Sequence, residues 1–254
     1  MEIVLLPSSA GPDTGYQFLA TVVVDGVLAL DAGCLGLWGD LAGQAKVRDV
    51  VLTHSHMDHV GSLPVFLENV YAAKAPVTVH GLAETLAAVR SDVFNERLFP
   101  DLITREPEAG PFAIFDALAP GRTRELAEHA VTLVPVNHPV PTAAVHVDGG
   151  DSSLLYVTDT RPTEAVWEYA ARVKNLKAVL LEATFPDEFA WLAEISVHLT
   201  PKLFAAEVRK IPPGVPVFVV HLKPRFRDAV LKELAALALP GVQVMTPGKR
   251  YGVG

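Results

Sequence analysis

Cysteine is almost absent from this 254-residue chain, and its scarcity excludes two kinds of structure. Cys34 is the only cysteine, so no intrachain disulfide can form and no cluster of thiolates can bind a metal. The chain also lacks any apolar run approaching the roughly 18 to 20 residues that a membrane-spanning helix needs. We therefore expect no membrane segment.

A secretory leader is not expected either. The first stretch, MEIVLLPSSAGP, has no basic residue before its short apolar run, and Pro7 ends that run early. A signal peptide needs both a basic start and a longer apolar core. Together with the single cysteine, this pattern favours a reducing, cytoplasmic location.

Positive charge is scarce as well. The chain has 21 Lys and Arg against 29 Asp and Glu, a formal net charge of −8, with no run rich in Lys and Arg. Proteins that grip a long nucleic acid usually present a basic stripe to its phosphates. We expect a small-molecule substrate and no long nucleic acid partner, although a local basic pocket is compatible with this composition.

Strand-like and helix-like stretches alternate along the chain, which predicts a mixed α/β fold. A hairpin is predicted at Asp25-Gly26, because an Asp-Gly pair between two apolar runs is a strong turn signal. Residues 100–125 are rich in Pro, Gly and charge and are expected to be mostly irregular. No linker marks a boundary, so residues 1–254 are expected to form a single domain. The expected strands lie within 18–33, 47–56, 75–81, 130–141, 142–160, 177–185 and 216–224, and the expected helices at 60–73, 82–98, 162–173, 199–211 and 226–237.

The chain contains a faint internal repeat. VLALDAG is followed about 17 residues later by DVVLTHSH, and LLYVTDT is followed at a similar distance by KAVLLEAT. Each pair is an apolar strand with a polar end, a helical gap and another such strand. Two similar halves could pack face to face and place four strand ends around one site.

The stretch LTHSHMDHVGSL concentrates chemistry in a few positions. Three of the nine histidines and one carboxylate lie within six residues, as His54, His56, Asp58 and His59. A surface loop with incidental histidines is the alternative, but imidazole and carboxylate are typical metal ligands, and this spacing can serve two ions. The stretch follows a buried strand, and open α/β sheets bind ligands at that edge.

Four residues cannot complete two metal sites, so further ligands are expected at other strand ends. His138, Asp159 and His221 each follow an apolar run, although alone each could be a cap or turn residue. We predict that Asp159 bridges two ions, because a carboxylate can offer one oxygen to each. The first ion is assigned to His54, His56 and His138, and the second to Asp58, His59 and His221. Zinc is expected foremost, with manganese or iron as alternatives.

In this order, HSHMDH, a lone His, an Asp and a final His resemble the metallo-β-lactamase superfamily. The motif set spans nearly the whole chain, from Asp31 to His221. The resemblance implies a four-layer αβ/βα sandwich of two similar halves, with the site at the strand ends, and a homodimer. The β-lactamases themselves place a Cys where this chain has Asp159. The full His/Asp set is more similar to the phosphodiester-cleaving members and the glyoxalase II thioesterases.

A second pair of residues narrows the chemistry. The stretch LLEATFPDEFAWLAEISVHLTP carries Glu182 and His198, and it resembles ribonuclease Z and the class II cyclic-nucleotide phosphodiesterases. In the nuclease branch a similar pair assists catalysis: His198 would give a hydrogen bond or proton to the phosphate, and Glu182 would orient it. From the residues alone, a surface carboxylate and a helix-start histidine are the simpler alternative.

Two further stretches resemble the cyclic-nucleotide branch. VFNERLFPDL is similar to that family's Phe-Asn then aromatic-Pro-Asp segment, and VHLTP and VVHLKP resemble its late signatures. Phe94, Asn95 and Phe99 are therefore candidate substrate contacts, with helix-end packing as the alternative. Met57 stands where the family has Leu, and the serine that follows in its signature is not evident.

The sequence thus predicts a dinuclear metal-dependent hydrolase that cleaves a phosphodiester, with a 3′,5′-cyclic nucleotide such as cAMP as the preferred substrate. The stretch between LLYVTDT and KAVLLEAT leaves no room for the tRNA-holding arm of ribonuclease Z. The alternatives are a ribonuclease Z-like nuclease, a thioester hydrolase, and a non-catalytic sensor of nucleotide or metal on the same fold. Asp58, His198 and Glu182 are the predicted catalytic set.

Overall fold

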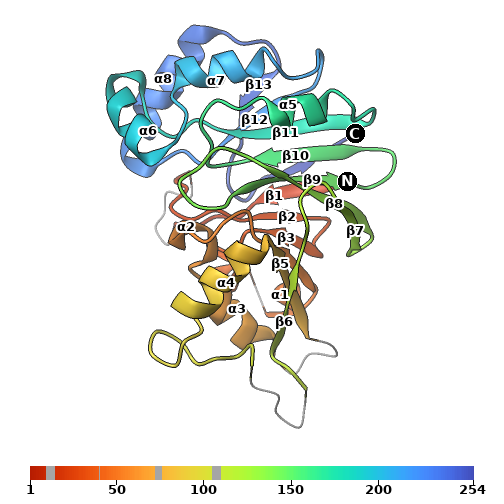
Figure 1. Ribbon diagram of the computed structural model, residues 1–254. Helices are drawn as coiled ribbons and strands as arrows, with labels where there is room; N and C mark the ends of the chain where they lie inside the picture. The colour runs from red at the N-terminus through yellow and green to blue at the C-terminus, as the bar shows by residue number, and fades with distance from the viewer. Residues whose placement is uncertain (10–14, 40, 72–75, 105–109) are drawn as a thin grey trace.

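Two β-sheets dominate the structure. A computed structural model describes residues 1–9, 15–39, 41–71, 76–104 and 110–254. Within these residues the strands form two seven-stranded sheets. Figure 1 shows the sheets packed against each other, with helices outside both. The predicted α/β sandwich is confirmed.

The strands lie in chain order in both sheets, except that the last strand of the chain pairs with the first. The first sheet consists of β14 (Arg250–Gly252), β1 (Glu2–Leu5), β2 (Val22–Val24), β3 (Leu28–Leu30), β4 (Asp49–Val51), β5 (Val77–Gly81) and β6 (Ala113–Ala117). The second consists of β13 (Val242–Val244), β12 (Val217–Val220), β11 (Leu176–Glu182), β10 (Ser153–Val157), β9 (Ala143–Asp148), β8 (His129–Pro135) and β7 (Thr123–Leu126).

The two sheets share one pairing pattern, which accounts for the internal repeat of the sequence. In the first sheet β14, β1, β2 and β3 pair antiparallel, and β3 to β6 pair parallel. In the second, β7 to β10 pair antiparallel, and β10 to β13 pair parallel. The repeated stretches are β3 with β4 and β10 with β11. The Asp25-Gly26 turn also forms as predicted: both residues have positive φ, and Val27 N–H donates to the Val24 carbonyl.

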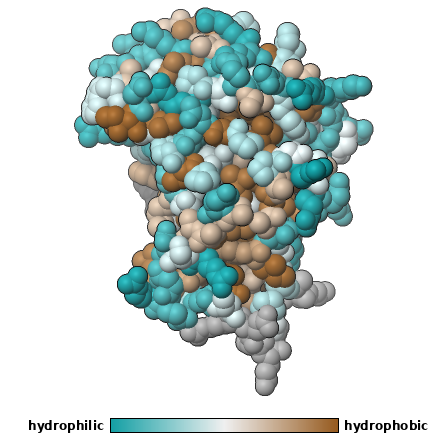
Figure 2. Space-filling view, in the orientation of Figure 1, coloured by the Kyte–Doolittle hydropathy of each residue, from teal (hydrophilic) through white to brown (hydrophobic). Residues whose placement is uncertain are grey.

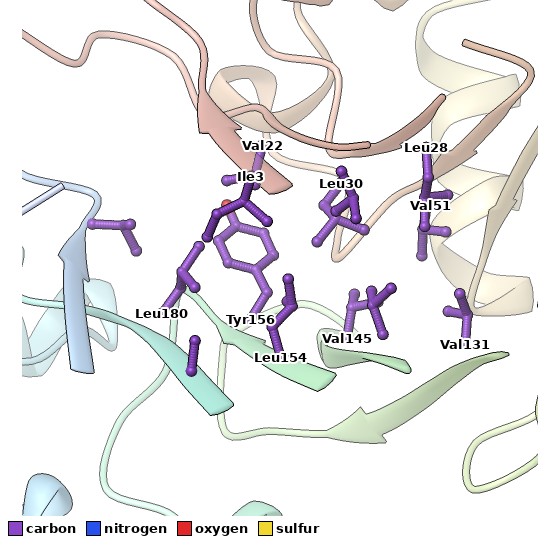
Figure 3. Packing of buried hydrophobic residues seen from close by; sticks show 14 of the residues in the cluster. Ile3, Val22, Leu28, Leu30, Val51, Val131, Val145, Leu154, Tyr156 and Leu180 are labelled. Atoms are coloured by element: carbon purple, nitrogen blue, oxygen red, sulfur yellow. The ribbon is translucent and has the colours of Figure 1, made fainter. Parts of the chain in front are cut away.

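Three apolar clusters fill the layers. The central cluster lies between the sheets, where Figure 3 shows Ile3, Val22 and Leu30 facing Leu154 and Tyr156. The other two clusters lie between each sheet and its helices. Strand residues alternate between these layers because successive side chains point to opposite faces, and this double burial gives the four-layer sandwich.

The helices cover the outer faces of the sheets. The helix α3 (Leu63–Val70) shows why: Leu63, Phe66, Leu67 and Val70 recur at helical spacing and are all buried. The helices before β7 are η1 (Leu35–Leu37), α1 (Leu41–Gln44), α2 (Met57–Val60), α3 (Leu63–Val70) and α4 (Ala83–Asp92). Those of the second half are α5 (Ala165–Ala170), η2 (Asp187–Phe189), α6 (Ala190–Ser196), α7 (Pro201–Val208), η3 (Pro224–Phe226) and α8 (Arg227–Leu237).

Three local predictions need correction. The helix expected over 82–98 ends at Asp92, because the Asn95 amide donates to the carbonyls of Ser91 and Asp92. The stretch expected to be irregular contains β6 and β7, which are edge strands with exposed residues; β7, with the sequence TREL, has no apolar run, and β6 is a short AIFDA stretch among Pro and Gly residues. The helix α6 was not expected. The parts of these predictions that fall on 72–75 and 105–109 lie outside the described residues.

No helix in the described part of the chain is both long and apolar enough to span a bilayer.

Candidate metal centre

The site lies where parallel strands of both sheets end. The segment 54–59 follows β4, Asp159 follows β10, and His221 follows β12 directly. Asp159 and His221 have positive φ, 51° and 57°, as does Asp31 after β3, at 62°. Left-handed backbone is uncommon outside glycine, although Asp and His tolerate it better than most residues. Each chain segment leaves its strand sharply and turns a polar side chain toward the gap between the sheets.

The seven predicted ligands are brought together as two groups. The ligand atoms of each group all lie within 4.8 Å of one another. Asp159 belongs to both groups, as the predicted bridging role requires. The first group is His54, His56, His138 and Asp159, and the second is Asp58, His59, Asp159 and His221.

The distances are those of donors that converge on a common point. His138 Nε2 lies 3.2 Å from His56 Nδ1. Asp159 Oδ2 lies 3.4 Å from the Nε2 atoms of both His54 and His59, and Asp159 Oδ1 lies 3.3 Å from His221 Nε2. Tetrahedral ligands at zinc–nitrogen bond length are separated by about 3.3 Å, so this spacing fits a metal.

The hydrogen bonds behind the histidines fix the rings so that their inner nitrogens face the cluster. His59 Nδ1 donates to Asp31 Oδ2 at 2.7 Å, and His138 Nδ1 donates to the Val197 carbonyl at 3.2 Å. A neutral imidazole with its proton on Nδ1 presents an unprotonated Nε2. Asp31 is thus both a turn residue after β3 and the hydrogen-bond partner of a predicted ligand histidine.

Two threonines repeat this arrangement in the two halves. The Thr53 hydroxyl donates to Asp31 and so accepts from His54 Nδ1, 3.0 Å away. The Thr184 hydroxyl donates to Glu182 and so accepts from His221 Nδ1, also 3.0 Å away. Each chain of carboxylate, hydroxyl and imidazole fixes a ring orientation and a tautomer.

The electrostatics suit a cation. Burial lowers the pKa of His56, of His221 and of His138, the last to about 4, so these imidazoles stay neutral at neutral pH. Burial opposes ionisation of Asp58, but the hydrogen bond from His221 and the nearby His59 and Lys223 outweigh it and hold the Asp58 pKa well below its usual range.

A bound metal would also provide a partner for a buried nitrogen atom that has no hydrogen bond. His54 Nε2 is fully buried and has no hydrogen-bond partner, although a buried polar atom without one is costly. His59 Nε2 faces His221 Nε2 at 3.4 Å. Burial opposes protonation of His59, but the Asp159 and Asp31 carboxylates raise its pKa well above its usual value, so a metal bound there would take the place of the Nε2 proton. The residues present therefore fit a divalent metal site.

The predicted pair Glu182 and His198 adjoins the cluster. Glu182 is fully buried, and its Oε1 accepts from His198 Nδ1 at 2.9 Å and from Thr160 N–H at 2.6 Å. The His198 ring stacks on His221 with centroids 5.4 Å apart. Burial lowers the pKa of His198, but the Glu182 carboxylate outweighs it and the net shift is upward. His198 lies in the loop between α6 and α7 rather than at a helix start.

The predicted substrate contacts lie elsewhere, after α4. Phe94 is only 2% exposed and its ring packs edge-on against Phe99 and Phe115. The Asn95 side chain donates to the end of α4 and accepts from the backbone N–H groups of Arg97 and Leu98. These contacts are the helix-end packing that the sequence allowed as an alternative. These contacts place none of Phe94, Asn95 and Phe99 beside the two groups of predicted metal ligands.

Sequence reasoning missed several residues at the site. Gln17 accepts a hydrogen bond from His221 N–H at 2.8 Å, and Lys223 Nζ lies 2.6 Å from Asp58 Oδ2. Outside these contacts, Trp191 and Ile195 of α6 are 60% and 70% exposed, and Figure 2 shows hydrophobic residues at the surface over this helix. Lys223 lies two residues after His221 in the stretch VVHLKP, and this short distance in sequence could have indicated that Lys223 belongs to the site.

A family assignment follows from the comparison with known proteins. The family model described as "Beta-lactamase superfamily domain" matches residues 35–221, a span that includes all seven clustered residues. The chain belongs to this superfamily. Its fold is the metallo-β-lactamase fold, and it is a metal-dependent hydrolase, as the sequence predicted.

Individual relatives agree with this assignment. The metallo-β-lactamase fold protein YhfI of Bacillus subtilis superposes with a TM-score of 0.75 at 13% identity, covering 98% of both chains. Unliganded yeast PDE1 also gives 0.75, at 19% identity and the same coverage of both chains. Ribonuclease J of Thermus thermophilus is 40% identical over 55 residues, which are 22% of this chain and 10% of the ribonuclease. The two solved structures show similarity of fold alone.

Proposed function

We propose that this hydrolase cleaves phosphodiesters and that 3′,5′-cyclic nucleotides are its preferred substrate class. The observation that carries the proposal is the Glu182–His198 pair, held at 2.9 Å beside the two donor groups. Hydrolysis of a neutral thioester needs no such proton donor, because a thiolate is a good leaving group. An alkoxide leaving a phosphate is more basic and benefits from one.

The metal roles follow the grouping of the ligands. His54, His56 and His138 would hold one divalent ion, Asp58, His59 and His221 a second, and Asp159 would serve both. Zinc is the first choice, since the donors are imidazole and carboxylate at tetrahedral spacing. Two such ions, when bound, supply an activated water and neutralise charge that develops on the phosphate.

The role of His198 rests on its hydrogen bonds. With Nδ1 held by the Glu182 carboxylate, Nε2 is the nitrogen that can reach a substrate. The upward shift in the pKa of His198 favours the protonated ring near neutral pH. His198 is therefore assigned as the proton donor to the leaving oxygen, and Glu182 as the residue that positions it.

The connection between β10 and β11 supports a compact substrate. It spans residues 158–175 and holds only α5, six residues long, so it offers no arm for tRNA. The similarity to ribonuclease J over 55 residues keeps a short single-stranded RNA as the second candidate substrate.

The first experiment is to incubate zinc- or manganese-loaded protein with 3′,5′-cyclic AMP and to follow 5′-AMP by chromatography, with EDTA as the control. We expect 5′-AMP that depends on metal. Parallel reactions contain a short single-stranded RNA and a glutathione thioester. If protein with two bound metals hydrolyses only the thioester, phosphodiester cleavage is refuted. Cleavage of RNA alone would make RNA, rather than a cyclic nucleotide, the proposed substrate. Tight nucleotide binding without product would favour a non-catalytic sensor.

A further inference from the structure

Lys223 brings a positive charge to the metal centre. It follows His221 by two residues, in the turn between β12 and η3. Its Nζ lies 2.6 Å from Asp58 Oδ2 and 3.4 Å from His221 Nε2. The side chain is 31% exposed and the Asp58 side chain 24% exposed, whereas His54, His59 and Asp159 are buried. The ammonium thus lies on the side of the donor groups that solvent reaches.

The two atoms that Lys223 contacts are also predicted metal ligands. A divalent ion that binds Asp58 Oδ2 and His221 Nε2 takes the lone pairs that now face the ammonium. Among the described residues, Asp58 is the only carboxylate that forms an ion pair with Lys223. In the metal-loaded protein the ion would compete with the ammonium for these two atoms, and Lys223 would remain tethered beside the site, where it could also bind another anion.

The surrounding sequence strengthens the positive charge beside the centre. Lys223, Arg225 and Arg227 lie within five residues of a chain whose net charge is −8. The guanidinium of Arg225 lies over the Phe226 ring, a contact that leaves its charge in place. Arg227 contributes less, because its Nη1 lies 3.4 Å from Asp228 Oδ1. Local positive charge at the mouth of a site raises the local concentration of anionic substrate.

We propose that Lys223 binds the anionic oxygen of the substrate and makes the site selective for anionic over neutral esters. The substrate it would recognise is the phosphodiester of the proposed function, on which this inference rests for its chemistry. The competing role is structural: Lys223 would only hold Asp58 in place for the metal.

The test compares Lys223→Gln, Lys223→Arg and the control Lys202→Gln, which removes the same charge from an exposed site on α7. Zinc stoichiometry and affinity are measured by titration calorimetry, and inorganic phosphate is then titrated into each zinc-loaded protein. We expect Lys223→Gln to keep two zinc ions with undiminished affinity and to bind phosphate about tenfold more weakly. Lys223→Arg should bind phosphate within a few-fold of the unchanged protein.

Loss of a zinc ion in Lys223→Gln would assign Lys223 the structural role and overturn the proposal. Unchanged phosphate affinity would also overturn it. Substrate preference gives a second readout: Lys223→Gln should lower kcat/KM for bis(p-nitrophenyl) phosphate about tenfold and leave p-nitrophenyl acetate unchanged.

The outcomes separate this proposal from the proposed function. If the protein cleaves no phosphodiester but phosphate binding depends on Lys223, the proposed function fails and the anion site stands. If it cleaves phosphodiesters and Lys223→Gln binds phosphate normally, only the role of Lys223 fails.

Discussion

Asp58 is a predicted metal ligand, and its side chain does not hold the surrounding loop in place. Its backbone carbonyl accepts from Ala20 N–H at 2.8 Å, whereas the partners of its carboxylate among the residues that the structure describes are His221, Lys223 and His59 of the centre. Removing the carboxylate therefore changes the site and leaves the hydrogen bond that holds the loop.

We expect Asp58→Ala to lower phosphodiester turnover by about 10³-fold or more, because a metal ligand and its charge are lost. The variant should stay folded, with a circular dichroism spectrum like that of the unchanged protein. Activity and bound metal are measured together after metal loading. Full activity in an Asp58→Ala variant that is fully loaded with metal would contradict the proposed two-metal site.

Two variants, His198→Asn and Glu182→Gln, test the separate roles of the two residues in the Glu182–His198 pair. We expect His198→Asn to lower kcat for the phosphodiester by about 10²- to 10⁴-fold and to spare any thioester activity. Glu182→Gln should retain more activity, since its amide oxygen can still accept from His198. The loss of rate on the basic side of its pH–rate profile should move to lower pH, because the carboxylate that raises the His198 pKa is gone. A profile that does not move in Glu182→Gln would leave Glu182 a purely structural residue.

At the scale of elements, close backbone packing fixes the segment 54–59, which carries four of the predicted metal ligands. Three segments meet at this point: Gly33 after β3, Ala20 before β2, and the start of α2. A Cβ placed on Gly33 would lie 2.0 Å from the Asp58 carbonyl oxygen and 2.7 Å from that of Ala20. Only glycine fits this contact, because both neighbours are backbone atoms that cannot move independently.

We expect Gly33→Ala to lower the free energy of unfolding by about 1–3 kcal/mol, as other overpacked cores do, and to weaken metal binding by displacing Asp58. Gly252→Ala is the control, since a Cβ there meets nothing within 4 Å. Thermal melts and zinc titration of both variants provide the measurement. Equal behaviour of the two variants would contradict the packing argument.

At the scale of the whole molecule, the centre joins the two halves. The first half supplies His54, His56, Asp58 and His59, and the second supplies His138, Asp159 and His221. A metal bound between them stabilises only the state in which the sheets are correctly apposed. A single domain over residues 1–254 and the homodimer both stay predictions.

Metal removal should therefore lower the melting temperature. With free zinc at about 100 times its dissociation constant, one site adds about 2.7 kcal/mol, or about 5–10 °C for a chain of this size. Calorimetric scans with zinc and with EDTA measure the difference, and one cooperative transition is expected in both. Identical scans would show that the groups bind no metal in the folded state.

Cys34 reports on the integrity of the first half. It is fully buried, and burial raises the pKa of its thiol to about 11. The native thiol should therefore resist an aromatic disulfide reagent at pH 8, and one thiol per chain should react after denaturation. Because the thiol ionises more readily in the unfolded chain, its stabilising contribution is present at neutral pH and is lost as the pH rises from about 9 to about 11. Rapid native labelling at pH 8 would contradict this burial.

Much of this centre was predictable from the sequence, because its ligands follow strand ends and keep a characteristic order. The periodic apolar runs likewise predicted the two similar halves. Edge strands were harder: β7, with sequence TREL, carries three exposed residues out of four, so it has no apolar pattern. Local capping at Asn95 also ended α4 earlier than its helical spacing suggested.

The sequence by itself determined the ligand types, their order and the α/β class, since these depend on residue identity and short-range spacing. Only the tertiary structure decided which atoms meet. Lys223 reaches Asp58 across 165 positions, and His59 and His221 face each other across 162, because two sheets pack with their strand ends together. Such contacts depend on where distant loops are held in space, and short-range spacing carries no record of that.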